Sequence, residues 1–183
     1  MHYRQLGSTG LNVSILSYGA SPLGNAFRTI DDHEGIRTVR PALDLGINFL
    51  DTSPHYGATK SETVLGRALQ GVPRDSYYLA TKVGQYGAGN FDFSATRVTQ
   101  SFEESCARLG TDYIDVLHCH DIEFADLNQI VNETRPALMQ LRDAGRVDTR
   151  PWITHRFKLA ETPTVFPKDI SGNPAVLKAM IEG

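Results

Sequence analysis

Short apolar runs alternate with longer amphipathic stretches along most of the chain. Residues 47–50, 77–81 and 113–119 are apolar runs rich in β-branched and aromatic residues, which is typical of buried strands. Residues 13–18 form an earlier apolar run, and residues 3–12 before it contain glycines at turn positions. The pattern therefore predicts four strands, preceded by a short hairpin or cap.

The stretches between the runs place apolar residues at helical spacing and begin at residues that cap helices. Asp31 or Asp32 is predicted to begin the first helix, Ser61 the second and Ser94 the third. A fourth helix is predicted to end at Gly145, because glycine readily adopts the left-handed conformation after a helix. Strands and helices are therefore expected to alternate.

This alternation predicts consecutive βα units, in which the strands run parallel and their carboxyl ends meet at one edge. Pro41 and Pro136 fall inside two of the predicted helices, where each predicts a kink because proline removes a helical hydrogen bond. A complete eight-stranded barrel commonly needs about 250 residues, and this chain has 183. We therefore expect an α/β fold equal to the first half of a (β/α)8 TIM barrel, about four βα units.

The composition is that of an ordinary globular protein, with 40% hydrophobic residues and a formal net charge of −3. Near-neutral charge without a basic stripe gives no reason to expect nucleic acid as a partner. The two cysteines, Cys106 and Cys119, do not make a disulfide framework, and no apolar run reaches membrane-spanning length. The polar first residues do not form a signal peptide, so we expect a cytoplasmic protein without a membrane partner.

Titratable side chains stand at or just past the ends of three apolar runs. Asp51 and Tyr56 follow the first of these runs, Lys82 the second and His120 the third. Because the carboxyl ends of parallel strands meet at one face, where βα proteins carry their catalytic groups, we expect these four residues to lie together. Packing alone does not explain such a set.

The four residue types suit proton transfer to or from an oxygen. A tyrosine phenol has a pKa of roughly 10, and a nearby ammonium lowers it by stabilising the phenolate. Lys82 can supply that charge, and Asp51 can hold the lysine by a charge-assisted hydrogen bond. His120 can donate a hydrogen bond to a carbonyl oxygen while another group moves a hydride.

The segment 118–121 needs a separate interpretation, because His118, Cys119, His120 and Asp121 could suggest a metal site. Alternation along a strand sends Cys119 to the face opposite both histidines, and no second ligand cluster follows at zinc spacing. We therefore expect no metal. His118 and His120 point to the same face, so alternation does not show which of them is the catalytic candidate. His120 is favoured because it lies nearer the carboxyl end of the strand.

Longer motifs carry a family resemblance. They occur in the order Leu6–Ser14, Leu43–Ser53, Ser61–Gly66, Ala80–Lys82 and Arg108–Asp115. On these motifs the chain from Tyr3 to about Val147 resembles the aldo-keto reductases, whose catalytic tetrad matches Asp51, Tyr56, Lys82 and His120. The resemblance implies a TIM barrel and an oxidoreductase that uses NAD or NADP.

Within this family the chain looks most similar to the L-galactose and L-fucose dehydrogenase branch, on the segments 19–24 and 117–124. That resemblance implies a small sugar as substrate, an aldose oxidised to its lactone. It also makes Gly19, Ala20 and Asp51 weak candidates for cofactor binding. The part of the family's barrel that binds the adenosine phosphate has no counterpart here, so the choice between NAD and NADP stays open.

Residues 148–183 resemble the C-terminal piece of medium-chain zinc-type alcohol dehydrogenases instead, without that family's zinc ligands or cofactor loop. We therefore predict a junction near Val147, between a half-barrel (residues 1–147) and a divergent, partly ordered tail (residues 148–183). A half-barrel would leave sheet edges exposed, which favours self-association. The alternative function is a catalytically inactive fragment that acts as an interaction or assembly subunit.

Overall fold

The computed structural model describes residues 1–7, 9–147, 155–158 and 179–182 of the 183-residue chain. Most of the predicted tail, residues 148–183, lies outside the described residues. Its described backbone consists of β9 (His155–Lys158) and β10 (Ala179–Glu182), which pair in parallel. The division of the chain near Val147 stays a prediction.

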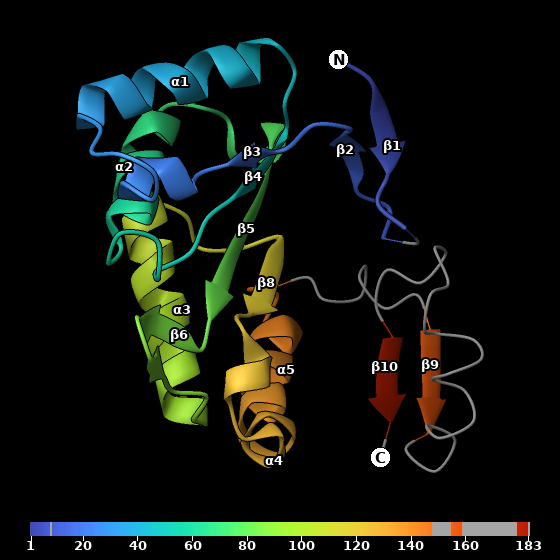
Figure 1. The fold of residues 1–183 in the computed structure, drawn as a ribbon. Helices are drawn as coiled ribbons and strands as arrows, with labels where there is room; N and C mark the ends of the chain where they lie inside the picture. Colours follow the sequence, from blue (N-terminus) through green and yellow to red (C-terminus); the bar gives the residue numbers. More distant parts are fainter. Residues whose placement is uncertain (8, 148–154, 159–178, 183) are drawn as a thin grey trace.

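A four-stranded parallel sheet forms the centre of the fold (Figure 1). Its order is β3 (Tyr18–Gly19), β4 (Phe49–Asp51), β5 (Tyr78–Val83) and β8 (Val116–Cys119), so strands that follow one another in this list lie side by side. The predicted parallel βα arrangement is confirmed. The strands are short, and each ends close to a residue of the predicted tetrad.

The prediction of one strand over residues 13–18 is wrong, because this run divides into two strands. β2 (Asn12–Ser14) pairs antiparallel with β1 (Tyr3–Gln5), which confirms the predicted hairpin, and only β3 joins the parallel sheet. Between the two strands the chain bends, and the side chains of Ile15 and Leu16 are exposed.

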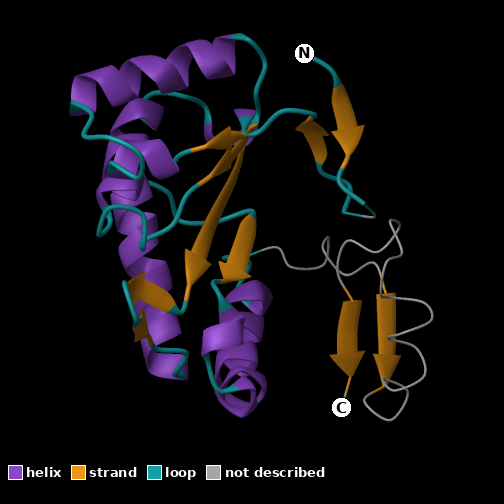
Figure 2. Cartoon of the chain, in the orientation of Figure 1, coloured by secondary structure: helices purple, strands orange, loops and turns teal. Residues whose placement is uncertain are grey.

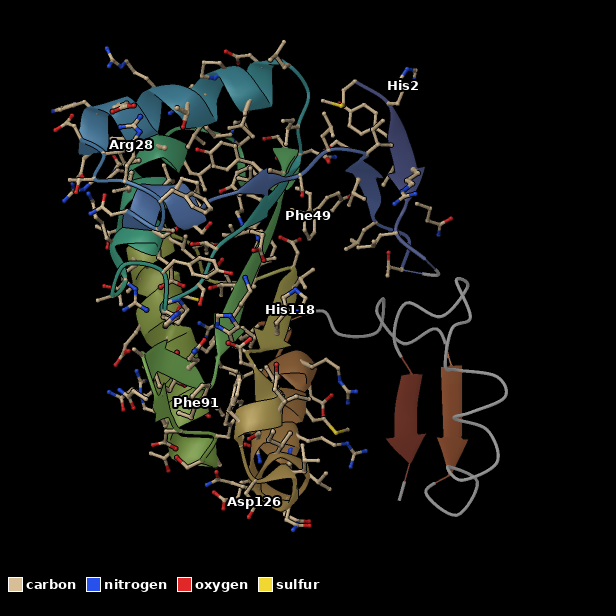
Figure 3. All side chains as sticks on the ribbon, in the orientation of Figure 1. His2, Arg28, Phe49, Phe91, His118 and Asp126 are labelled. Carbon is tan, nitrogen blue, oxygen red and sulfur yellow. The ribbon has the colours of Figure 1, made fainter. Side chains whose placement is uncertain are left out.

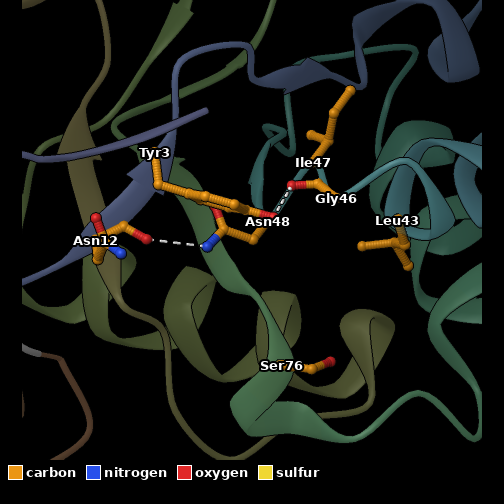
Figure 4. Close-up of a pocket in the computed structure, with 7 residues that line it drawn as sticks. All are labelled: Tyr3, Asn12, Leu43, Gly46, Ile47, Asn48 and Ser76. Atoms are coloured by element: carbon orange, nitrogen blue, oxygen red, sulfur yellow. Dashed lines mark hydrogen bonds between the residues drawn. The ribbon is translucent and has the colours of Figure 1, made fainter. Parts of the chain in front are cut away.

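Asn48 explains where the division falls. Its side-chain oxygen accepts a hydrogen bond from the Ser14 amide at 2.7 Å, and its own amide N–H donates to the Ser14 hydroxyl at 3.1 Å. The Asn48 side-chain nitrogen also donates to the Asn12 carbonyl, and the Tyr3 hydroxyl donates to the Gly46 carbonyl (Figure 4). These bonds fasten the hairpin to the end of the sheet at which β4 begins.

Helices α1 (Asp32–Asp44) and α3 (Ala95–Leu109) begin as the sequence predicts. The Asp31 carboxylate accepts a hydrogen bond from the His33 amide at 2.9 Å, and the Ser94 hydroxyl accepts one from the Arg97 amide at 3.3 Å. Both bonds satisfy backbone donors that a helix start leaves without helical partners. Helix α1 continues past Pro41 to Asp44.

The predicted cap of α2 (Lys60–Leu69) is wrong, because Ser61 lies inside the first turn of this helix. Its hydroxyl donates to the Ala20 carbonyl at 2.7 Å and lies 2.9 Å from the Thr52 hydroxyl. The side chain that resembled a cap is therefore used for buried contacts with two loops that follow strands.

The predicted fourth helix is present but irregular. It consists of α4 (Leu127–Gln129), a π-helical segment (Ile130–Thr134) and α5 (Arg135–Asp143). The π-helical segment ends at Thr134, two residues before Pro136, whose missing N–H interrupts regular helical bonding. Gly145 follows α5 with a φ of +73° and donates its N–H to the Arg142 carbonyl, so the predicted end of the helix is confirmed.

The helices gather on one side of the sheet (Figure 2), and the main core lies between them and the strands. Leu50, Leu79, Leu65 and Phe102 are fully buried there. The shorter elements are the hairpin β6 (Gln85–Gly87) with β7 (Asn90–Phe91) and the 3-10 turns Ser21–Gly24, Arg74–Ser76 and Ile122–Phe124. Among the described residues, no helix combines the length and the apolar character needed to cross a membrane.

Candidate active site at the carboxyl ends of the strands

Alternation along β5 decides which side chains face the helices and which face the site. The Thr81 hydroxyl donates to the Glu62 carboxylate of α2 at 2.6 Å, so Thr81 faces the helical layer. Successive residues of a strand point to opposite faces, and Lys82 therefore points to the other face of the sheet.

Lys82 and Asp51 form a two-pronged ion pair across neighbouring strands. The Lys82 Nζ lies 2.8 Å from each carboxylate oxygen of Asp51 and 2.7 Å from the Thr52 carbonyl oxygen. An ammonium has three N–H donors, and these acceptors use them all. The Lys82 side chain is 12% exposed and the Asp51 side chain 30% exposed, so the ion pair is largely enclosed but still accessible to solvent.

Tyr56 lies beside this ammonium. The Lys82 Nζ is 4.8 Å from the centre of the Tyr56 ring, and the ring lies in turn 5.8 Å from the His120 ring at an angle of 89°. The Tyr56 amide donates to the Ser53 carbonyl, and the Tyr56 carbonyl accepts from the Ser61 amide. The loop that carries Tyr56 is therefore fastened at both ends.

Gly24 allows this loop to approach the segment after β3. A Cβ atom built on Gly24 would lie 2.5 Å from the Tyr56 carbonyl oxygen, a distance that no real contact of this kind reaches. Gly57 packs on the same segment, with its own built Cβ 2.2 Å from the Gly24 carbonyl oxygen and a φ of +64°. Only glycine fits at either position without a shift of the Tyr56 loop.

His120 follows β8 and is fixed by its backbone and its ring. Its amide donates to the Val83 carbonyl at 2.9 Å, and its Nδ1 lies 3.2 Å from the Ser53 hydroxyl oxygen. Burial lowers the pKa of His120 below its ordinary value, and the charge of Lys82 acts in the same direction, while Asp121 opposes it. The lowered pKa favours the neutral form of the imidazole.

The structure brings all four predicted tetrad residues into one cluster and separates the two histidines. His118 lies on β8 (Figure 3) and pairs in register with Lys82, whereas His120 lies past the strand, beside Tyr56 and Ser53. The cluster also contains Ser53 and His55, which sequence reasoning did not single out. Both fall between two tetrad residues in the chain, and that proximity was the only available signal.

The weak cofactor candidates differ in what they expose. Gly19 is exposed, pairs with Asp51 across the sheet, and has no atom within 4 Å of a Cβ built on it. Ala20 is fully buried; its N–H donates to the Asp51 carbonyl, and its own carbonyl accepts from Ser61. Gly19 therefore offers open space beside the cluster, and Ala20 does not.

No group of three or more His, Cys, Asp or Glu side chains in the described part of the chain is arranged to hold a metal ion. The cluster instead combines an ion pair, a phenol and a neutral imidazole at the carboxyl edge of a parallel sheet. This fold and this cluster define an α/β protein of parallel βα units with a candidate proton-transfer site.

Comparison with known proteins agrees with this class. A sequence model described as "Aldo/keto reductase family" matches residues 15–149, and the chain belongs to this family. The chain is 55% identical over 145 residues to "L-galactose dehydrogenase" of Arabidopsis thaliana, a match that covers 78% of this chain and 45% of that protein. It is 36% identical over 163 residues to "D-threo-aldose 1-dehydrogenase" of a Pseudomonas species, covering 76% and 50%.

Solved structures show the same fold. An aldo-keto reductase from Bacillus halodurans in its holo form superposes with a TM-score of 0.70 at 34% identity, covering 80% of this chain and 48% of that one. The chain thus spans about half the length of the curated relatives it matches. The family match ends at residue 149, and the resemblance of the later residues to medium-chain alcohol dehydrogenases stays a prediction.

Proposed function

We propose that the chain carries the proton-transfer groups of an NAD(P)-dependent oxidoreductase that oxidises an aldose, such as L-galactose or L-fucose, to its lactone. The observation that carries the proposal is the ion pair of Lys82 with Asp51, which lies against the Tyr56 ring. The His120 ring also contacts the Tyr56 ring. The sugar is suggested by the 55% identity to the protein named L-galactose dehydrogenase.

Tyr56 is the group that takes the proton from the anomeric hydroxyl of the sugar. Its phenolate forms beside the Lys82 ammonium, 4.8 Å from the ring centre, and that charge stabilises it. Asp51 holds the ammonium through both carboxylate oxygens and so keeps it from turning away toward solvent.

His120 orients the reacting oxygen, and its hydrogen bonds indicate which nitrogen does so. The Ser53 hydroxyl oxygen already accepts a hydrogen bond from the His55 amide at 3.1 Å, so its own proton can be donated to the His120 Nδ1. In that tautomer the Nε2 carries the proton. Nε2 lies 3.8 Å from Asp121, too far for a hydrogen bond, and can donate to a substrate oxygen.

The residues present fit one edge of a nicotinamide nucleotide, since the backbone at Gly19 is open next to Asp51. When bound, this group would accept the hydride from the sugar carbon. Members of this family generally use NAD(P)H, and the Bacillus halodurans relative is described as a holo form. Specificity for NAD or NADP would be determined by the residues that bind the adenosine end of the cofactor.

The experiment is NADH formation by the purified chain with NAD and L-galactose, compared with Tyr56→Phe. We expect the substitution to lower kcat by at least about a hundredfold, the usual contribution of one general acid–base group. The far-UV circular dichroism should not change, because the phenyl ring keeps the contacts with Lys82 and His120. Equal turnover by both proteins would remove Tyr56 from the mechanism.

The alternative is a catalytically inactive subunit that acts in interaction or assembly. It predicts neither turnover nor quenching of protein fluorescence by NADH. Gel filtration separates the two cases further, because β3 stands at one end of the sheet with Gly19 exposed, and an exposed strand edge pairs readily with another chain. Elution as a defined dimer that turns over sugar would favour an enzyme completed by self-association.

A further inference from the structure

The 3-10 turn that follows β8 and the helical segment after it expose a group of large apolar side chains. They are Ile122, Phe124, Leu127 and Val131, which are 39%, 68%, 59% and 55% exposed. Single exposed apolar residues are ordinary on a protein surface, whereas a contiguous group of them commonly marks an interaction site. The question is therefore whether these side chains are contiguous.

The four side chains form one surface together with Phe91, which we call the 122–131 surface. Leu127 and Val131 lie one helical turn apart, so they occupy the same side of the helical segment. The Phe124 ring, in the turn before it, packs on the Phe91 ring of β7 with 5.7 Å between the ring centres and an angle of 36° between the planes. Phe91 lies at the end of the molecule toward which β5 and β8 run (Figure 3).

The charged side chains carried by the 122–131 surface and its margins are acidic. No lysine or arginine occurs from Gly110 to Thr134. The carboxylates next to the apolar residues in the chain are those of Asp92, Asp121, Glu123, Asp126 and Glu133. Among the described residues, none of these carboxylates forms an ion pair with a lysine or an arginine. The apolar surface therefore has an acidic rim that the described cations do not neutralise.

We propose that the 122–131 surface binds a basic amphipathic helix of another protein. The apolar face of such a helix covers Phe124, Leu127 and Val131, and its lysines or arginines meet the acidic rim. A second copy of this chain that used the same surface would bring one acidic rim against another, and like charges in contact are unfavourable. The same repulsion disfavours an anionic lipid surface. The proposal does not depend on sugar oxidation.

Fluorescence anisotropy with the full chain measures the binding of a labelled probe. The probe is a peptide of about 15 residues made of leucine and lysine, with the leucines on one face of the helix. One control peptide has glutamate in place of lysine, and a second has the leucines and lysines scrambled so that no apolar face forms. We expect both controls to bind at least about tenfold more weakly than the probe. A probe that does not bind, or that binds no better than either control, would overturn the proposal.

Phe124→Gln and Leu127→Gln test the apolar part of the surface. Both side chains are mostly exposed, so the substitutions should leave the fold intact, which circular dichroism checks. Each should weaken binding of the probe at least about fivefold, as expected for an apolar anchor. Phe27→Gln is the matched control, because Phe27 is 83% exposed on the loop before α1, and it should change the affinity by less than about twofold. Wild-type affinity in both surface variants would refute the assignment.

A second pair of substitutions tests the acidic rim. Asp126 also caps α4, since its carboxylate accepts a hydrogen bond from the Asn128 amide at 2.8 Å, and asparagine caps a helix equally well. The double variant Glu123→Gln/Asp126→Asn should therefore keep the helix and weaken binding at least about threefold at low salt, with a smaller dependence on salt. Asp75→Asn, at an exposed carboxylate in the 3-10 turn before β5, is the control. Equal affinity in the double variant and this control would contradict the role of the rim.

Sedimentation velocity without peptide tests a second copy of the chain as the occupant. We expect the double variant Phe124→Gln/Leu127→Gln to sediment as wild type does, because the surface does not hold two copies together. A wild-type dimer that this double variant dissociates would assign the 122–131 surface to self-association and overturn the proposal.

Discussion

Removal of Arg108 is expected to destabilise the protein more than any exposed charge substitution. Arg108 on α3 donates through its Nε to the Glu62 carboxylate of α2 at 2.7 Å, and Glu62 is completely buried. The other Glu62 oxygen accepts the Thr81 hydroxyl of β5 at 2.6 Å. One carboxylate therefore joins two helices and the strand that carries Lys82.

The magnitude follows from what Arg108→Met leaves behind. The Arg108 side chain is 20% exposed and the Glu62 side chain 0%, so the substitution leaves a desolvated charge whose remaining partner among the described residues is the Thr81 hydroxyl. Loss of one partner of a buried pair costs about 3–5 kcal/mol. Loss of both charges costs less, because an apolar pair of similar volume is often neutral. The double variant Arg108→Met/Glu62→Met should therefore be more stable than Arg108→Met alone.

Urea denaturation followed by circular dichroism measures these free energies of unfolding. Arg67→Met is the control, because Arg67 stands on α2, the helix of Glu62, but pairs with Asp32 at the surface, where the Arg67 and Asp32 side chains are 54% and 37% exposed. Such a pair contributes about 0–1 kcal/mol. The reasoning is refuted if Arg108→Met stays within about 1 kcal/mol of wild type, or if the double variant is no more stable than the single one.

Three other substitutions test the site and its supports. Lys82→Met should lower kcat by at least about a hundredfold, since the Tyr56 phenolate loses its stabilising charge, as measured by NADH formation with L-galactose. Gly24→Ala should displace the Tyr56 loop and cost about 1–3 kcal/mol in thermal unfolding, because the new Cβ meets the Tyr56 carbonyl; an unchanged melting temperature and kcat would contradict the close approach. The lowered pKa of His120 means that the unfolded chain takes up this proton first, so stability should fall as pH drops through the ordinary histidine range toward the lower folded value. His120→Asn should reduce that pH dependence of the melting temperature, and an identical dependence in the variant would contradict the assigned shift.

The parallel sheet could be predicted from sequence because three of its strands are apolar runs that end in polar residues. The first strand could not, since its division depends on hydrogen bonds between Ser14 and Asn48, which are 34 residues apart. The start of α2 was misplaced for a related reason. Ser61 has the local sequence of a cap, but its hydroxyl reaches Ala20 and Thr52, and neither partner is visible in a local pattern.

The grouping of the tetrad was predictable because strand ends place Asp51, Lys82 and His120 at one edge. The position of Tyr56 was less so, because it lies on a loop whose path depends on the contact between Gly24 and the residues around Gly57. That same loop brings His55 against the Tyr56 and His120 rings. Ring distances of this kind depend on backbone conformation, which spacing in a sequence does not encode.

The first turn of α2 joins the candidate proton-transfer site to the core. This connection bears on how an absence of turnover would be interpreted. Ser61 binds Thr52, whose carbonyl accepts a hydrogen bond from Lys82, while Glu62 binds Thr81, the residue before Lys82. Both routes run through residues 51–82, and His120 is attached to the same unit through Ser53. These bonds between described residues therefore hold Lys82, Asp51 and His120 in one cluster. If a folded chain shows no Tyr56-dependent turnover, we would therefore look first for a defect in the binding site of the nicotinamide, and not for a displaced tetrad.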